Sequence, residues 1–87
     1  MELTEEILEE IAYVMVSKHR QNVMKSLNEK MKLPSQICND VDIAPNHLSN
    51  VLKELSEHDL VQCVNPNAVK GRLYRITDKG KAVVENL

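Results

Sequence analysis

Apolar residues recur at helical spacing through the first thirty positions of the chain. In the first segment they stand at positions 7, 8, 11, 12, 14, 15 and 16, and Thr4 supplies an N-cap before them. Ser17 can cap a second segment, at about 18–30, whose apolar face holds Val23, Met24 and Leu27. The pattern predicts two helices in close succession.

Two prolines mark where the next two helices begin. Pro34 and Pro45 suit a first helical turn, where the N–H that proline lacks has no partner within the helix anyway. The helix at Pro34 is expected to be short, because the polar stretch 39–43 is typical of a helix end and a tight turn. The helix at 44–57 is amphipathic. Its apolar positions follow the i, i+3, i+4, i+7 pattern and are Leu48, Val51, Leu52 and Leu55.

The hydrophobic period changes in the last third of the chain. The runs 60–64 and 73–76 are typical of short strands, and residues that favour turns separate them. Thr77 can cap a final helix at about 78–86. We therefore predict a single domain over 1–87, mainly α with a small β-hairpin, in the order α-α-α-α-β-β-α.

Two helices joined by a short turn and followed by a hairpin form the winged helix-turn-helix arrangement. Its second helix, here 44–57, fits the major groove of duplex DNA, and its hairpin loop, the wing at 65–72, reaches the phosphate backbone or a minor groove. The candidate DNA-binding residues are Pro45, Asn46, His47, Ser49, Asn50, Lys53, Asn67, Lys70 and Arg72. The simpler alternative is that these residues form only the solvated face of a helix and an ordinary turn.

Four stretches carry a resemblance to known proteins: 33–37, 43–55, 60–61 and 70–80, the last containing the sequence Gly-Arg-x-Tyr-Arg-Ile-Thr-Asp-Lys-Gly. They resemble the winged-helix transcriptional regulators of prokaryotes, the MarR-like and ArsR-like groups. Ser17-Lys18-His19-Arg20 is similar to the opening of the second helix in small single-domain regulators of archaeal type. The resemblance covers about 17–85 and implies a sequence-specific, double-stranded DNA-binding transcriptional regulator that acts as a homodimer. The chain departs from the pattern at Ala44, where a Ser or Thr is frequent, and has no Arg in helix 44–57.

The net charge of −2 taken alone speaks against nucleic-acid binding, but the charge is segregated along the chain. Residues 1–17 carry five Glu and no base, whereas the remainder has a net charge of +3. Between positions 65 and 81 the balance is +4. Local charge governs what a surface attracts, because salt screens charges over about 8–10 Å.

The acidic first helix is expected to lie away from DNA, since its carboxylates would repel a phosphate backbone. Its apolar stripe is wide for a small domain, so we expect it to pack on the domain and on a second copy. The last helix would share that homodimer contact through Val83, Val84 and Leu87. The alternative function is a protein–protein interaction module within a larger assembly.

Composition narrows the remaining functions. The chain has two Tyr and neither Phe nor Trp, which excludes an aromatic platform for single-stranded nucleic acid. No catalytic motif is present, so an enzyme is not predicted, nor is any cofactor or metal. Cys38 and Cys63 are expected to be small buried residues in a protein of the cytoplasm, and no apolar run reaches the length of a membrane span.

For several other side chains the sequence predicts only whether they are buried or exposed. Met15, Met24 and Met31 are expected in the core, and Lys79 and Lys81 in solvent. The bases of the 18–20 segment either touch a phosphate or only keep their helix soluble, and the sequence favours neither alternative.

Overall fold

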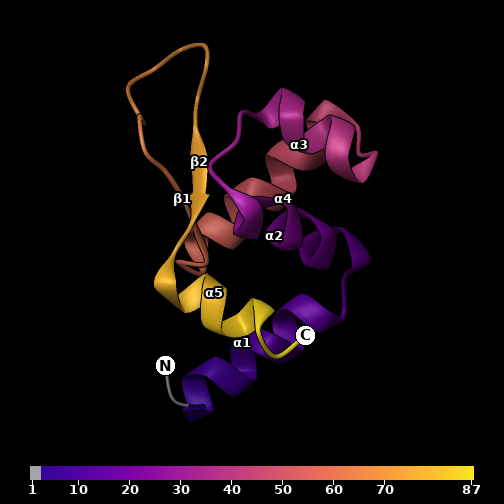
Figure 1. Cartoon of the computed structure of the whole chain (residues 1–87), viewed down its shortest axis with the longest axis vertical. Coiled ribbons are helices and arrows are strands. Elements are labelled where there is room, and N and C mark those ends of the chain that lie inside the picture. The colour runs from indigo at the N-terminus through magenta and orange to yellow at the C-terminus, as the bar shows by residue number, and fades with distance from the viewer. Residues whose placement is uncertain (1–2) are drawn as a thin grey trace.

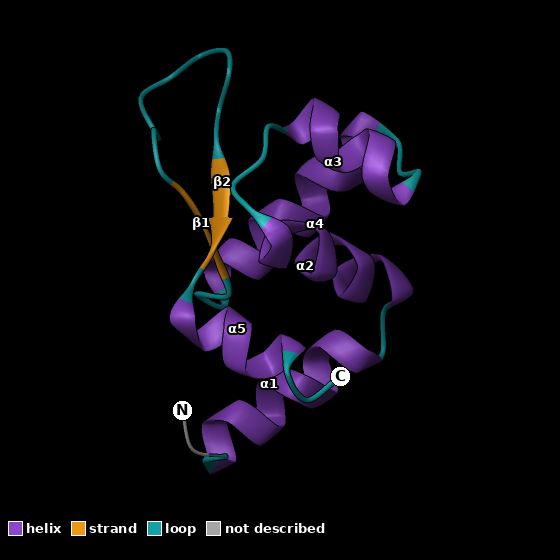
Figure 2. Cartoon of the chain, in the orientation of Figure 1, coloured by secondary structure: helices purple, strands orange, loops and turns teal. Residues whose placement is uncertain are grey.

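The computed structural model describes residues 3–87 as five helices and a two-stranded antiparallel hairpin (Figures 1 and 2). The elements are α1 (Glu5–Met15), α2 (Lys18–Glu29), α3 (Pro34–Val41), α4 (Pro45–Glu57), β1 (Val61–Cys63), β2 (Tyr74–Ile76) and α5 (Asp78–Val84). Their order confirms the predicted one, and the fold is a winged helix-turn-helix with α3 and α4 as the helix pair. The wing loop lies at one end of the molecule, and α1 and the C-terminus lie toward the other (Figure 1).

The predicted caps account for where the helices begin. The side-chain oxygens of Thr4, Ser17 and Thr77 accept backbone hydrogen bonds at the starts of α1, α2 and α5. The strands are each shorter than predicted. Leu60 instead lies in the turn that follows α4, where its N–H donates to the Leu55 carbonyl at 2.9 Å.

The core is aliphatic, as the composition requires. Met24, Leu27, Ile37, Leu48, Leu55 and Leu60 are its largest fully buried side chains. The prediction for two other methionines is wrong: Met15 is 55% and Met31 is 50% exposed. Met31 precedes the buried Lys32, and in extended chain successive side chains point to opposite sides. Cys38 and Cys63 are half-buried free thiols and not fully buried as predicted.

Lys32 joins the hairpin to the helix pair, a contact that the sequence did not predict. Its backbone forms an antiparallel bridge with Tyr74, with N–H to O distances of 3.0 and 2.9 Å. Its buried ammonium donates to Glu29 Oε1 at 2.8 Å, to Ser26 Oγ at 3.0 Å and to the Asp40 carboxylate. One residue therefore ties β2, the end of α2 and α3 together.

The contacts of Lys32 with Tyr74, Glu29, Ser26 and Asp40 are called the Lys32 clip below. The pKa values of Lys32 and Asp40 reflect the geometry of this clip. Burial of Lys32 opposes its charge, but the hydrogen bonds to Asp40 and Glu29 outweigh burial and hold the pKa of Lys32 above its usual value. The hydrogen bonds from Lys32 and Ser26 hold the pKa of Asp40 below its usual value. The pair is thus charged at neutral pH.

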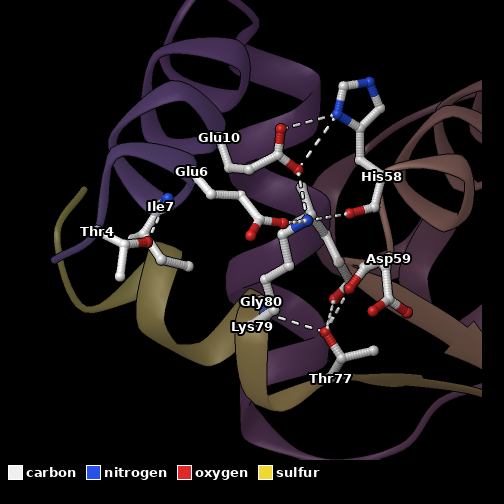
Figure 3. Close-up of polar contacts among 10 residues, drawn as sticks. Thr4, Glu6, Ile7, Glu10, His58, Asp59, Thr77, Lys79 and Gly80 are labelled. Atoms are coloured by element: carbon white, nitrogen blue, oxygen red, sulfur yellow. Dashed lines mark hydrogen bonds and ion pairs between the residues drawn. The ribbon is translucent and has the colours of Figure 1, made fainter. Parts of the chain in front are cut away.

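A second polar cluster fixes α1 onto α4 and α5 (Figure 3). The Lys79 ammonium pairs with Glu6 Oε1 at 2.9 Å and Glu10 Oε2 at 3.4 Å, and it donates to the His58 carbonyl at 3.0 Å. His58 Nδ1 lies 2.9 Å from the buried Glu10 carboxylate. Lys79 is therefore not the solvent charge that was predicted, and part of the acidity of α1 is neutralised within the molecule.

Replacing Asp40 by Ala is expected to lower the free energy of unfolding by about 1–3 kcal/mol, because the buried Lys32 ammonium loses a charged acceptor. Lys32→Met keeps the backbone bridge and buries no charge, so it should cost less than about 1 kcal/mol. Urea denaturation measures both values. The control Asn39→Ala, an exposed neighbour on α3, should stay within about 0.5 kcal/mol of wild type.

The penalty of Asp40→Ala should also depend on pH. Because the pKa of Asp40 is lowered by folding, its contribution is present above the unfolded value, near 3.8, and is lost as the pH falls through the folded value. The difference in urea midpoint between wild type and Asp40→Ala should shrink between pH 7 and pH of about 3. A constant difference over that range contradicts the assigned pairing.

Candidate nucleic-acid interface

One face of α4 is exposed along its whole predicted length. Pro45, Asn46, His47, Ser49, Asn50 and Lys53 are all exposed, whereas Leu48, Val51, Leu52 and Leu55 of the opposite face are buried. Ala44 caps the helix without a side-chain hydrogen bond. Backbone N–H groups in the first turn, together with the helix dipole, therefore face outward and favour an anion.

The wing extends beside this helix from β1 and β2 (Figure 1). Its predicted contact residues Asn67, Lys70 and Arg72 are exposed. Arg72 is nevertheless engaged within the loop: its Nε donates to the Ala68 carbonyl at 3.0 Å and one terminal nitrogen donates to the Pro66 carbonyl at 2.9 Å. The Lys70 ammonium makes no hydrogen bond or ion pair with residues 3–87.

A groove of about 730 Å³ separates the outer face of α4 from the hairpin. Among its lining residues it brings together three of the predicted ones, Ser49, Lys53 and Arg72. Glu57 and Asp59 line it as well, so the groove is cationic only in part. Asn46 and His47 at the start of α4, and Asn67 and Lys70 in the wing, lie outside the groove lining.

The structure decides the role of Arg20, which the sequence left open. Its guanidinium donates to the Tyr13 carbonyl at 2.9 Å, pairs with Glu54 at 3.4 Å, and lies 3.9 Å from the centre of the Tyr13 ring. Arg20 is half-buried and thus links α1, α2 and α4. The ring of His19 contacts the ring of His47, with centroids 4.3 Å apart, and this contact positions His47 on α4.

Sequence reasoning also missed the role of Asn65, which it treated only as a strand breaker. The Asn65 side chain donates to the Gly71 carbonyl at 3.0 Å and accepts from the Leu73 N–H at 2.7 Å. It closes the base of the wing across both limbs. The Asn-Pro-Asn sequence signalled the turn but not this bridge.

Among residues 3–87, no three His, Cys, Asp or Glu side chains are grouped so as to hold a metal ion. No helix in the same part of the chain has the length and apolar character needed to cross a membrane.

The fold is shared with solved transcription-regulator structures. Bordetella bronchiseptica BpsR is 14% identical with a TM-score of 0.76, over 92% of this chain and 68% of that one. MarR from E. coli is 20% identical with a TM-score of 0.75, over 93% and 61%. BigR from Xylella fastidiosa is 22% identical with a TM-score of 0.74, over 98% and 93%. Comparison with protein-family models and with curated proteins gave no match.

Removing the internal contacts of Arg20 is expected to destabilise the domain. Arg20→Ala loses a hydrogen bond, an ion pair and a cation–π contact, and should lower the free energy of unfolding by about 1–3 kcal/mol in urea denaturation. Lys18→Ala is the matched control, because this base on the same helix is exposed, and its effect should stay within about 0.5 kcal/mol. Equal losses in the two variants contradict the internal role.

Proposed function

We propose that this protein is a sequence-specific, duplex-DNA-binding transcriptional regulator that places α4 in the major groove and the wing on the backbone or minor groove. The observation that carries the proposal is the exposed polar face of α4 beside a wing that bears unpaired Lys70. All nine candidate residues are exposed, as a contact surface for DNA requires. The fold supports the proposal, because BigR is a transcriptional repressor and DNA binding by BpsR is regulated by 6-hydroxynicotinic acid.

The chemistry of α4 assigns different tasks to its residues. Asn46 and Asn50 can pair through their amides with the N6 and N7 edge of adenine. Ser49 and Lys53 line the groove between α4 and the hairpin, where a sugar–phosphate strand would pass, and suit phosphate contacts. Bound at a promoter, such a domain would act by occlusion or recruitment.

The acidic α1 supports the same orientation. It lies at the end of the molecule opposite the wing, so its carboxylates are kept away from a duplex bound at α4 (Figure 1). Lys79 also neutralises part of their charge. The net charge of −2 is therefore compatible with a cationic interface.

We further infer a homodimer formed through α1. Leu8 and Met15 are 54% and 55% exposed, and with Ile11 and Ala12 they share one face of the helix. A second copy would bury that face and double the number of DNA contacts. At the C-terminal end of the chain, the residues that could still contribute to the dimer contact are Val84 and Leu87, which are half-buried. Val83 is fully buried in the core of its own chain, which corrects the prediction for that residue.

The direct test of function is selection from a pool of random duplexes, followed by fluorescence anisotropy at several salt concentrations. Asn50→Ala should relax the selected sequence preference, whereas Lys70→Ala should weaken binding to every sequence and reduce the salt slope by about one. Lys81→Ala removes an exposed base on α5 and should leave both unchanged. Absence of binding to any duplex at low ionic strength overturns the proposal and favours the protein-interaction module.

The dimer is tested separately by analytical ultracentrifugation. The double variant Leu8→Glu with Met15→Glu should sediment as a monomer, because like charges would face each other across the twofold axis. The control is Met31→Glu, at a similarly exposed position after α2, and this variant should sediment like wild type. If wild type is still a monomer at a protein concentration of about 100 µM, any association is weaker than that of a stable interface, and the dimer is contradicted.

A further inference from the structure

The wing is held in one shape by its own hydrogen bonds. Asn65 bridges its two limbs through Gly71 and Leu73, and the Ala68 N–H donates to the Asn65 carbonyl at 3.0 Å. Gly71 has a φ of 68°, in the left-handed region that favours glycine. The loop therefore has a defined conformation without a hydrophobic cluster of its own.

Arg72 completes this bracing. Two of its three guanidinium nitrogens donate to the carbonyls of Pro66 and Ala68, on the opposite limb of the loop. A guanidinium that binds a phosphate does so through the same planar fork of donors. The geometry thus directs the fork of Arg72 into the loop, and leaves Lys70 as the cation free to meet DNA.

The wing loop exposes Val69 to solvent. Its side chain is 95% exposed, more than any other large apolar side chain in residues 3–87. Valine is restricted at χ1, so it loses little conformational entropy when it is buried by a partner. Its neighbours Lys70 and Arg72 are cationic, and residues 65–73 contain no acid. An apolar tip flanked by positive charge fits a polyanion better than an apolar or basic protein surface.

We propose that Val69 is an apolar contact that enters a minor groove of the duplex, with Lys70 on a flanking phosphate and Arg72 as the positioning residue that braces the wing. The proposal rests on the proposed DNA-binding function and specifies the role of the wing within it. A valine has no donor for a phosphate oxygen. Deoxyribose rings and base edges in the minor groove do offer apolar contact, and proteins that read this groove use apolar side chains there.

The test compares wing variants on the duplex selected by the wild-type protein. Val69→Ser should weaken binding about threefold to tenfold with an unchanged salt slope, because an apolar contact releases no counterion. Val64→Ser, an exposed valine at the base of the hairpin, is the control and should bind like wild type. If wild type binds and Val69→Ser binds equally well, the inference fails while the proposed function stands. If wild type binds no duplex, the proposed function fails.

Modified DNA identifies the groove. Replacing adenine by 2,6-diaminopurine in the base pairs flanking the major-groove site adds an amino group to the minor groove only. The replacement should weaken DNA binding by the wild-type protein by about the same factor as Val69→Ser does. It should weaken binding by the Val69→Ser variant much less, because the two changes remove the same contact. Equal losses for both proteins place Val69 outside the minor groove and overturn the inference.

The bracing role of Arg72 is tested by Arg72→Lys and Arg72→Gln. Neither side chain reproduces the planar fork, so both variants should bind DNA similarly weakly. In the free protein, the amides of residues 66–71 should become more mobile by heteronuclear NOE in both variants. An Arg72→Lys variant that binds like wild type and keeps a rigid wing overturns the positioning role.

Discussion

The position of the hairpin relative to the helix pair depends on the clip at Lys32. Two backbone hydrogen bonds to Tyr74 attach the segment after α2 to β2, and the buried ammonium attaches the same segment to α3 through Asp40. A hairpin of two three-residue strands has little stability by itself. The clip adds a bridge from Lys32 to one edge of the hairpin and links that bridge to α3. The distance between the wing and the exposed face of α4 follows from this attachment.

Two further polar clusters connect α1 to the rest of the domain. Arg20 connects α1, α2 and α4, and the contacts of Lys79 and His58 with Glu10 hold the acidic helix at the end away from the wing. The acidic helix and the basic wing are thus separated in space as well as in sequence (Figure 1). This separation allows an overall anionic chain to present a surface suited to a phosphate backbone.

The helices and the outward face of α4 were predictable because they depend on local periodicity. The spacing of Leu48, Val51, Leu52 and Leu55 determines which residues of α4 remain outside, whatever the rest of the fold. The roles of Lys32, Arg20, Lys79 and Arg72 were not predictable, since each depends on carbonyls or carboxylates brought near by the tertiary structure. A long basic side chain looks like a solvent charge in sequence, and only the fold decides whether its partners are internal. The exposure of Met15 was not predictable either, because only the tertiary structure determines which part of the wide apolar stripe of α1 is buried.

We propose that the face formed by α4 and the wing binds duplex DNA. The most direct measurement is an NMR titration of the ¹⁵N-labelled protein with the selected duplex at low ionic strength. We expect amide shift changes concentrated in residues 45–53 and 66–72, with α1 unchanged except where two copies meet. Shift changes concentrated on the acidic face of α1, or none anywhere, would contradict it.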